Sequence, residues 1–425
     1  MATTLFKNVR VLDATGERPY SGDVLIQGNR IAKVERNLNT ITGDNHRIVE
    51  GHGMTLMPGL CDAHAHFSWI DQPTLDAIGM LPTEEHLLES MRSAATYLDM
   101  GFTSCLGAAA AKPRLDVVIR NYINSGKIPG PRYYAASTEI ATIGGLGDLN
   151  PGHVAAYTFV EVINGPMEMR ACVRRFLKEG VDNIKLNLSG ENITGMEAER
   201  TPMADDEVAE AVQEARRKPG TRVLAHARSD GSVRQCLTHG VDIIYHASYV
   251  ADETIERLAA VKDKHIIGPG VAWLYQTCYN ASDWGITPDV ARQMGYYREL
   301  EASIAGVKKM KAAGIRIVPG GDYGFAWTPH GTYAKDLEYF VDLYGFTPME
   351  AIMSATKTGG EVMLMPDELG LVKNGYLADL ILVDGDPLAD ITILQDRTRI
   401  TAVMKDGAFH REPPQAFVSR MALAG

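Results

Sequence analysis

The segment GLCDAHAHFSWID, residues 59–71, places two histidines, His64 and His66, at the end of a short apolar run. Side chains alternate between the two faces of a β-strand, so residues two apart point the same way. His64 and His66 would therefore share one face. Because imidazole is the commonest metal-binding side chain, the pair predicts two metal ligands. Two partly buried histidines with ordinary hydrogen bonds are the alternative.

Four other short apolar runs carry a polar side chain that could join such a site. These side chains are Lys185 in NIKLNLSG, His226 in RVLAHARS, His246 in DIIYHASY and Asp322 in RIVPGGDYG. Each is a metal-compatible group, or could become one, at or near the end of a predicted strand. Such groups on five predicted strands are hard to explain by packing alone, so the whole set favours a metal site.

The middle of the chain has the elements needed to bring these side chains together. Helix-period segments with acidic starts and glycine ends alternate with short apolar runs. The eight runs are CDAHAHF, TSCLGAA, RYYAAS, NIKLNLSG, RVLAHARS, DIIYHASY, HIIGPGVAW and RIVPGGDYG. This alternation predicts a parallel sheet, and the count of eight predicts a (β/α)8 TIM barrel over residues 58–366. The chemistry of such barrels lies at the C-terminal ends of the strands.

The two ends of the chain have a different pattern. Stretches such as GDVLIQGNRIAKVERN and GYLADLILVDGDPL alternate apolar and polar residues between turn residues. This pattern is typical of short strands joined by turns. We expect residues 1–57 and 367–425 to form one small β-sandwich domain.

Lys185 lies inside a predicted buried strand, where keeping an ammonium group charged is costly and the pKa should fall. One interpretation is a lysine paired with an acid such as Asp182, Glu191 or Asp322. The other is a lysine carboxylated by CO2, since the two carbamate oxygens could bridge two cations. Two divalent metals about 3.5–4 Å apart are typical of two-metal hydrolases.

With these residues in place, the sequence resembles the metal-dependent amidohydrolase superfamily. The resemblance covers nearly the whole chain, from MPGLCDAHAHF through Lys185, His226, His246 and Asp322 to NGYLADLILVDGDPL. It is greatest with the branch of imidazolonepropionase, Xaa-Pro dipeptidases, ochratoxin-type amidases, and phenylurea and molinate hydrolases.

The resemblance implies a binuclear centre. His64, His66 and Asp322 would hold one metal, His226 and His246 the other, and carboxylated Lys185 would lie between them. Zinc is the first expectation for both divalent ions, with iron, manganese or cobalt as alternatives. Asp322 would also be the catalytic general base.

The sequence departs from dipeptidases of this branch around the substrate. GGLGD has Leu146 where those enzymes tend to have histidine, and Arg228 stands where a tyrosine tends to follow the strand-5 histidine. Arg228 could bind a substrate carboxylate or carbonyl, or pair with an acid. A peptide substrate is therefore less favoured than the family resemblance alone would imply.

Aromatic residues follow several predicted strand ends. Such walls around a metal centre suit a flat, apolar substrate, although packing within a lid is an alternative. Together with Arg228, the candidate substrate-binding residues are Trp69, His153, Trp273, Tyr275, Tyr323, Trp327 and His330.

The overall composition restricts the partners. The chain has 425 residues, 45% of them hydrophobic and 22% charged, and a net charge of −11, which argues against nucleic acid or an anionic membrane surface. Five scattered cysteines without a CxxC pair fit a reducing cytoplasm. Neither a signal peptide nor a membrane-spanning run is apparent. We expect a cytoplasmic homo-oligomer that acts on a small molecule.

These observations predict a hydrolase that cleaves the C–N bond of an aromatic amide, urea or carbamate. A metal lowers the pKa of bound water toward about 7, and a general base accepts the water's proton. An Xaa-Pro dipeptidase or an N-acyl amino acid hydrolase is the alternative within this class. A deaminase is less favoured because of Lys185, and a non-catalytic relative would not need all six site residues.

Overall fold

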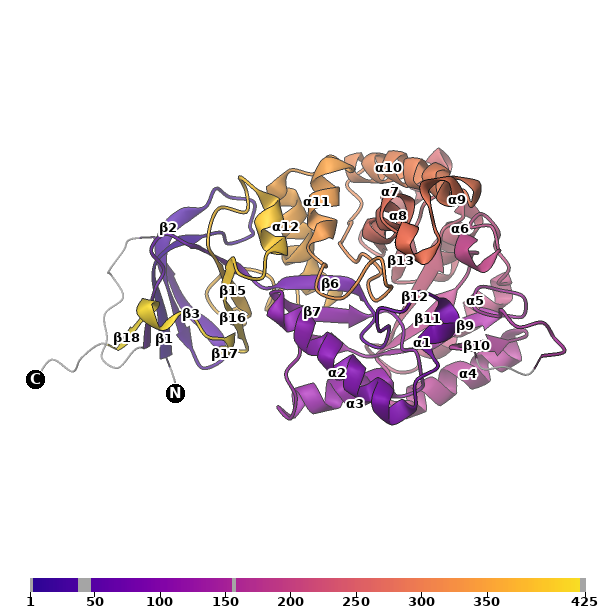
Figure 1. Cartoon of the computed structure of the whole chain (residues 1–425), viewed down its shortest axis with the longest axis horizontal. Helices are drawn as coiled ribbons and strands as arrows, with labels where there is room; N and C mark the ends of the chain where they lie inside the picture. Colours follow the sequence, from indigo (N-terminus) through magenta and orange to yellow (C-terminus); the bar gives the residue numbers. More distant parts are fainter. Residues whose placement is uncertain (1–2, 37–46, 155–157, 421–425) are drawn as a thin grey trace, which may run out of the picture.

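The computed structural model describes residues 3–36, 47–154 and 158–420. Figure 1 shows a small sheet on one side and a larger α/β body on the other. The first strands and the last strands of the chain lie together in the small sheet, and the middle of the chain forms the larger body.

The small sheet is one hydrogen-bonded sheet of nine strands among the described residues, with the main order β17-β16-β15-β5-β1-β2-β3. β4 pairs with β1, and β18 pairs with β4. The prediction that both ends of the chain build one sheet is therefore correct. Its strands are β1 (Thr3–Val11), β2 (Tyr20–Gln27), β3 (Arg30–Glu35), β4 (Arg47–Glu50), β5 (Thr55–Pro58), β15 (Leu380–Val383), β16 (Ile400–Lys405), β17 (Ala408–Arg411) and β18 (Val418–Arg420).

The larger body contains two parallel sheets. One has the order β6-β7-β8 and the other the order β10-β9-β11-β12-β13-β14. Most of these strands are buried along their whole length, which explains their continuous apolar runs. Their bounds are β6 (Leu60–Ala65), β7 (Phe102–Gly107), β8 (Arg132–Tyr134), β9 (Ala136–Thr142), β10 (Val160–Ile163), β11 (Asn183–Asn187), β12 (Arg222–Ala227), β13 (Ile243–His246) and β14 (Ile266–Gly268).

The third predicted strand differs from the structure. RYYAAS spans β8 and only the start of β9, which continues to Thr142, and β10 was not predicted. A single strand ending at Ser137 was therefore wrong. The side chains at the C-terminal end of this strand therefore come from residues further along the chain than the sequence pattern indicated.

The eighth predicted strand, RIVPGGDYG, does not form a regular strand. Residue Ile317 makes an isolated bridge to Ile267. The Val318 N–H donates to the Ile267 carbonyl at 2.9 Å, and the Ala63 N–H donates to the Pro319 carbonyl at 3.1 Å. Because Pro319 has no N–H, a continuous ladder cannot form here. The segment nevertheless lies between β14 and β6 and brings Asp322 to the site.

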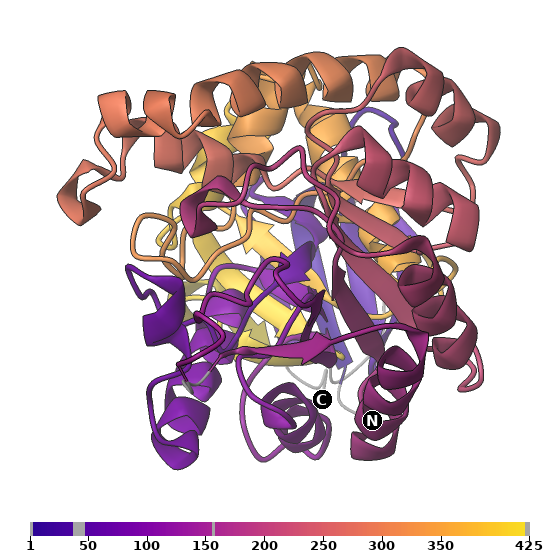
Figure 2. The ribbon, with the colours of Figure 1, turned by 90° about the vertical axis from the view of Figure 1, so that its right-hand side faces the viewer.

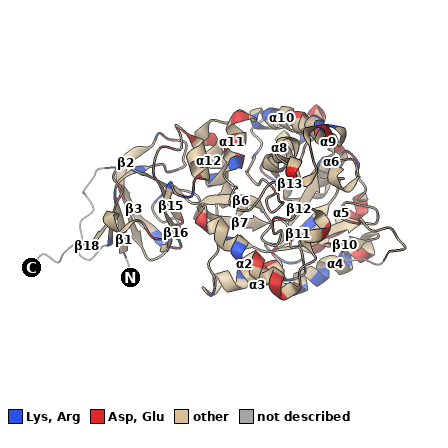
Figure 3. Ribbon diagram, in the orientation of Figure 1, with Lys and Arg blue, Asp and Glu red and all other residues tan. Residues whose placement is uncertain are grey.

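Helices surround the parallel strands, as Figure 2 shows. The helix-period segments EEHLLESMRSAATYLDMG, MEMRACVRRFLKEG, ADDEVAEAVQEARRK and ADETIERLAAVKDK correspond to α2, α4, α5 and α7. Figure 3 shows both signs of charge on helices such as α4 and α10. The helices are α1 (Leu75–Ile78), α2 (Thr83–Asp99), α3 (Leu115–Asn124), α4 (Pro166–Glu179), α5 (Asp205–Ala215), α6 (Asp230–His239), α7 (Asp252–Ala260), α8 (Val271–Tyr279), α9 (Pro288–Gln293), α10 (Tyr296–Ala312), α11 (Lys335–Asp342), α12 (Pro348–Ala355) and α13 (Lys357–Val362). No helix within the described ranges has both the length and the apolar character needed to span a bilayer.

Candidate metal centre

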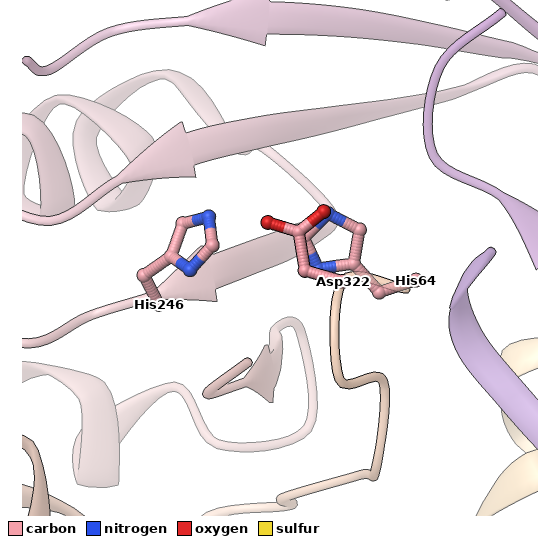
Figure 4. A group of neighbouring side chains, drawn as sticks. All are labelled: His64, His246 and Asp322. Atoms are coloured by element: carbon pink, nitrogen blue, oxygen red, sulfur yellow. The ribbon is translucent and has the colours of Figure 1, made fainter. Parts of the chain in front are cut away.

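Three of the predicted ligands lie together at the ends of the parallel strands. Ligand atoms of His64 on β6, His246 on β13 and Asp322 lie within 4.8 Å of one another. Figure 4 shows these side chains gathered around one point. His66, two residues after His64, places its Nε2 3.2 Å from Asp322 Oδ1.

The remaining two predicted ligands lie beside this group. The rings of His226 and His246 have centroids 4.5 Å apart. Lys185 lines the same cavity as His64, His226, His246 and Asp322. The structure therefore brings all six predicted side chains to one place, although only three of their ligand atoms form the tight group.

Backbone carbonyls hold two of the imidazoles, each through one ring nitrogen. His66 Nδ1 lies 3.1 Å from the Ala109 carbonyl, and His226 Nε2 lies 3.0 Å from the Gly190 carbonyl. A histidine that donates one ring N–H to a carbonyl presents the lone pair of its other nitrogen, as metal-binding histidines usually do.

Several ligand atoms in the cluster are buried without a hydrogen-bond partner among the described residues. They are His64 Nδ1, His66 Nε2, both ring nitrogens of His246, and Asp322 Oδ1. Buried polar atoms normally have partners, so each exception needs an explanation. A divalent cation would satisfy imidazole and carboxylate atoms together, and this donor set is one that zinc accepts. The residues therefore fit a metal.

The electrostatics of the cluster also suit metal binding. Burial lowers the pKa of all four histidines, so their imidazoles are neutral and can act as ligands. Burial alone would raise the pKa of Asp322, but the imidazoles of His64 and His66 beside its carboxylate outweigh burial and lower the pKa. Burial lowers the pKa of Lys185, while Glu139 and Asp322 partly oppose this.

The backbone is strained at two of the three clustered residues. His246 and Asp322 have φ values of +72° and +61°, in the left-handed region that non-glycine residues rarely adopt. Such conformations cost about 1–3 kcal/mol each and gather at functional sites.

A glycine permits the close approach of two segments at the cluster. A Cβ on Gly320 would lie 2.5 Å from His64 Cβ, so only glycine lets the segment before Asp322 pack this tightly against β6. Asp336 holds the same segment, since its carboxylate accepts the Gly320 N–H at 2.7 Å and the Ala272 N–H at 3.1 Å.

The cluster lines a narrow cavity of about 40 Å³. The walls above the ligands are largely apolar and are formed by Trp69, Leu75, Leu146, Phe159, Ile193, Trp273 and Phe325. The arrangement presents apolar side chains to any group that enters beside the ligand cluster.

The structure does not support a substrate-binding role for Arg228. Its side chain is 1% exposed and is not among the described residues that line the cavity. It pairs with Glu191 and Glu299, and Tyr296 also donates to Glu191 at 2.7 Å. Of the two alternatives for Arg228, the structure favours pairing with an acid, because Glu191 and Glu299 hold its guanidinium group.

Only two of the predicted aromatic residues line the cavity, Trp69 and Trp273. The Trp69 ring stacks on His66 with centroids 3.3 Å apart. Trp327 instead donates its indole N–H to Thr277 Oγ1 at 2.9 Å, and Tyr323 donates to the Tyr333 carbonyl at 3.1 Å.

The other predicted substrate residues also lie outside the cavity lining. Tyr275 stacks on Tyr339 with centroids 4.6 Å apart. His330 contacts Tyr333 and the Trp69 carbonyl through its two ring nitrogens. His153 lies in an exposed loop. Of the predicted substrate-binding residues, the structure therefore places Trp69 and Trp273 in the cavity wall, and the substrate role of the others stays a prediction.

Two acids in the cavity wall were missed as site residues. Glu139 on β9 is 5% exposed, and its Oε1 lies 3.6 Å from Lys185 Nζ. Glu191, considered only as a partner of Lys185, lines the cavity and pairs with Arg228 instead. Glu139 is a single acid inside the mostly apolar run ASTEIAT, just as Lys185 is a single lysine inside an apolar run. It could have been identified in the same way, but the predicted strand ended before it.

Comparisons with known proteins agree with this geometry. The sequence model of the amidohydrolase family matches residues 55–409. Ochratoxinase from Aspergillus niger is 26% identical over 397 residues, which is 88% of this chain and 78% of the relative. Ochratoxinase is of the kind expected from the sequence, and the alignment is long enough to include every residue from His64 to Asp322.

Solved structures show the same fold. A Xaa-Pro dipeptidase with bound methionine has a TM-score of 0.86 and 26% identity, with 97% of this chain and 100% of the other covered. Phenylurea hydrolase B has a TM-score of 0.73 and 21% identity, with 96% of both chains covered, and shows likeness of fold alone. Because the family model spans most of its length, the chain belongs to the amidohydrolase family and is an enzyme of that family.

Proposed function

We propose that this enzyme hydrolyses the C–N bond of an uncharged aromatic amide, urea or carbamate. The observation that carries the proposal is the gathering of four neutral imidazoles, Lys185 and Asp322 at the base of one apolar cavity. Water has to be activated for attack on such a carbonyl, and this donor set is suited to that task.

In this proposal the cluster binds divalent metal. A metal ion held here would lower the pKa of a water molecule and polarise the substrate carbonyl. Asp322 accepts a proton from the attacking water and passes it to the leaving nitrogen. The hydrogen bond between His66 and the Ala109 carbonyl orients one imidazole, and Trp69 and Phe325 restrict the water around the reacting bond.

We further infer a binuclear centre with carboxylated Lys185. His64, His66 and Asp322 would hold one ion, and His226 and His246 the other. Reaction with CO2 requires a neutral amine, and the lowered pKa of Lys185 favours it. Zinc remains the first expectation for both ions.

The cavity favours an uncharged aryl substrate over the alternatives. Xaa-Pro dipeptides and N-acyl amino acids present a carboxylate, and burying an unpaired charge costs several kcal/mol. Arg228, the cation considered for this role, is occupied by two acids. The likeness to a Xaa-Pro dipeptidase keeps that activity as the second candidate.

A substrate comparison tests the proposal. The metal-loaded protein should have a higher kcat/KM on a phenylurea, an aryl carbamate or an anilide than on Xaa-Pro dipeptides and N-acyl amino acids. Faster dipeptide cleavage would establish the second candidate, and turnover that is unaffected by thorough metal removal would refute the metal-dependent mechanism.

We also propose the finer architecture expected from the sequence. Hydrogen bonds from the 315–320 segment to both β14 and β6 support closure of the strands into a (β/α)8 barrel over residues 58–366. A β-sandwich formed by residues 1–57 and 367–425 stays a prediction, as does a homo-oligomer, and residues 1–2, 37–46 and 421–425 lie outside the described part.

A further inference from the structure

A second hollow adjoins the ligand cavity and is not used by the proposed chemistry. It has a volume of about 270 Å³, whereas the cavity that contains the ligand cluster has about 40 Å³. Leu75 and Ile193 line both spaces, so the two are neighbours. We call the second space the outer hollow, and its apolar lining consists of Leu75, Leu149, Ile193, Trp284 and Ile286.

The ligand cavity is too small for a whole substrate. A water molecule needs about 10–15 Å³ of cavity space, so a cavity of about 40 Å³ holds about three waters or one small group. Small-molecule sites usually measure about 300–1,000 Å³. Metal ions held by the cluster would use part of the space that is left. The reacting carbonyl group fits here, but the remainder of a substrate has to lie elsewhere.

Three short segments from distant parts of the chain contribute to the outer hollow. Leu75 begins helix α1, Ile193 lies in the 3-10 helix η1 (Asn192–Thr194), and Trp284 ends the 3-10 helix η2 (Ser282–Trp284). Each segment belongs to the connection that follows a parallel strand, namely β6, β11 or β14. These connections lie on the side of the sheet where the ligand cluster lies, so the hollow is on the reactive side of the molecule.

Trp284 differs from the other tryptophans in its exposure. Its side chain is 40% exposed, whereas Trp69, Trp273 and Trp327 are at most 4% exposed. The rings of Trp284 and Trp327 have centroids 6.3 Å apart, so a buried neighbour supports the exposed ring. An indole that remains exposed beside a hollow offers a large apolar surface for a ligand to cover.

The polar side chains of the outer hollow offer little specific recognition. Within the described lining, Asp76 is the only charged side chain, and it is exposed to solvent. The hydroxyl groups of Thr74 and Thr194 already bond to their own segments: Thr74 accepts the Ala77 N–H at 3.4 Å, and Thr194 donates to the Glu191 carbonyl at 2.7 Å. The outer hollow therefore suits an apolar group.

We propose that the outer hollow is a second substrate subsite, which binds an apolar group extending from the reacting carbonyl past Leu75 and Ile193 to Trp284. This inference rests on the proposed function, because it extends the substrate of the same site. It defines the substrate as an elongated molecule with an alkyl or aryl extension several carbons long. Trp284 is then a specificity-determining residue that selects substrates by length.

Binding of ketones tests the inference without turnover, because a ketone has no C–N bond to cleave. Isothermal titration calorimetry on the metal-loaded protein would compare acetophenone with two ketones that are four carbons longer. Hexanophenone is extended on the acyl side, and 4′-butylacetophenone is extended on the ring side. We expect at least one of them to bind about tenfold more tightly than acetophenone, because its additional CH₂ groups leave water.

Variants then assign this preference to the outer hollow. Trp284→Ala removes its largest apolar side chain and should reduce the preference to about twofold or less. Thr194→Trp fills the hollow and should have the same effect. Tyr122→Ala is the matched control, since it removes an exposed aromatic side chain from helix α3, outside both linings, and should keep the preference. Metal content and thermal unfolding are measured for every variant.

Three results would overturn the inference. The first is that neither longer ketone binds more tightly than acetophenone. The second is a preference that persists in both Trp284→Ala and Thr194→Trp at normal metal content. The third is a changed assembly state of Trp284→Ala in sedimentation with the preference retained, which would make the hollow a contact between copies of the chain.

Failure of the proposed function is a separate outcome. The expected ketone preference, together with no hydrolysis of any amide, urea or carbamate, would refute the reaction and leave the outer subsite in place.

Discussion

Two buried polar clusters adjoin the same cavity, and they differ in how completely the protein satisfies them. Around Arg228, each charged group has a partner of opposite charge: the guanidinium contacts Glu191 and Glu299, and Ser248 also donates to Glu299 at 2.8 Å, so that only Arg228 Nε lacks a hydrogen-bond partner among the described residues of this cluster. Around His64, His246 and Asp322, several ligand atoms have no hydrogen-bond partner in the described part of the chain. Both clusters are almost inaccessible to solvent.

Buried polar groups that support the fold therefore differ from buried polar groups that are available to bind a ligand. A buried charge that is fully paired contributes to the fold, and removing one partner leaves another charge uncompensated. Buried ligand atoms without partners instead favour the arrival of a cation. Burial alone therefore does not reveal which cluster performs chemistry, and the number of unused donor and acceptor atoms is more informative.

The largest effect should come from Asp322→Asn, which changes the unpaired cluster with little change in shape. We expect kcat/KM to fall about 10²–10⁴-fold, the usual cost of losing a general base. Steady-state kinetics on the best substrate, with thermal unfolding and metal analysis as controls, would measure this. Near-normal turnover with the metal retained would show that Asp322 is not the base.

Arg228→Met changes the paired cluster, and we expect its main effect on stability rather than on turnover. Loss of the guanidinium leaves Glu191 and Glu299 buried without their cation, and we expect the free energy of unfolding to fall by about 3–5 kcal/mol. Chemical denaturation would measure it. Arg292→Met, which breaks an exposed pair with Asp289, is the control and should cost less than about 1 kcal/mol. Equal costs would contradict the structural role of Arg228.

Added metal should stabilise the protein through the unpaired cluster. At a free metal concentration of 100 times the dissociation constant, binding to the folded state alone contributes about 2.7 kcal/mol. Thermal unfolding with and without zinc would detect the shift, and it should largely disappear in His246→Ala. Elemental analysis should give close to two ions per chain with bicarbonate present; one ion with unmodified Lys185 would leave a mononuclear site.

Gly320→Ala should produce the smallest of these effects. The new Cβ would meet the backbone nitrogen of His64 at 2.8 Å, so the segment before Asp322 would have to move away from β6. We expect a loss of about 1–3 kcal/mol in stability, as for overpacking, together with weaker metal binding. Gly152→Ala, where an added Cβ meets nothing within 4 Å, is the control. Unchanged metal affinity in Gly320→Ala would mean that the close approach does not position the ligands.

Local patterns predicted much of the ligand cluster. Alternation along one strand related His64 to His66, and the order of apolar runs placed His226, His246 and Asp322 at neighbouring ends of a parallel sheet. The structure brings these side chains together in the expected place. Glu139 was missed because strand β9 continues to Thr142, beyond the predicted end of that strand.

The sequence by itself determined the alternation of strands and helices, the joint sheet of the two ends and which candidate metal-binding residues would meet, because these depend on local periodicity and strand order. Only the tertiary structure decided which nearby polar groups remain unpaired. Glu299 reaches Arg228 from 71 residues away, and Thr277 takes the Trp327 donor from 50 residues away. Partners so distant in the chain leave no periodic signal, since their meeting depends on how helices α8 and α10 pack over the strands.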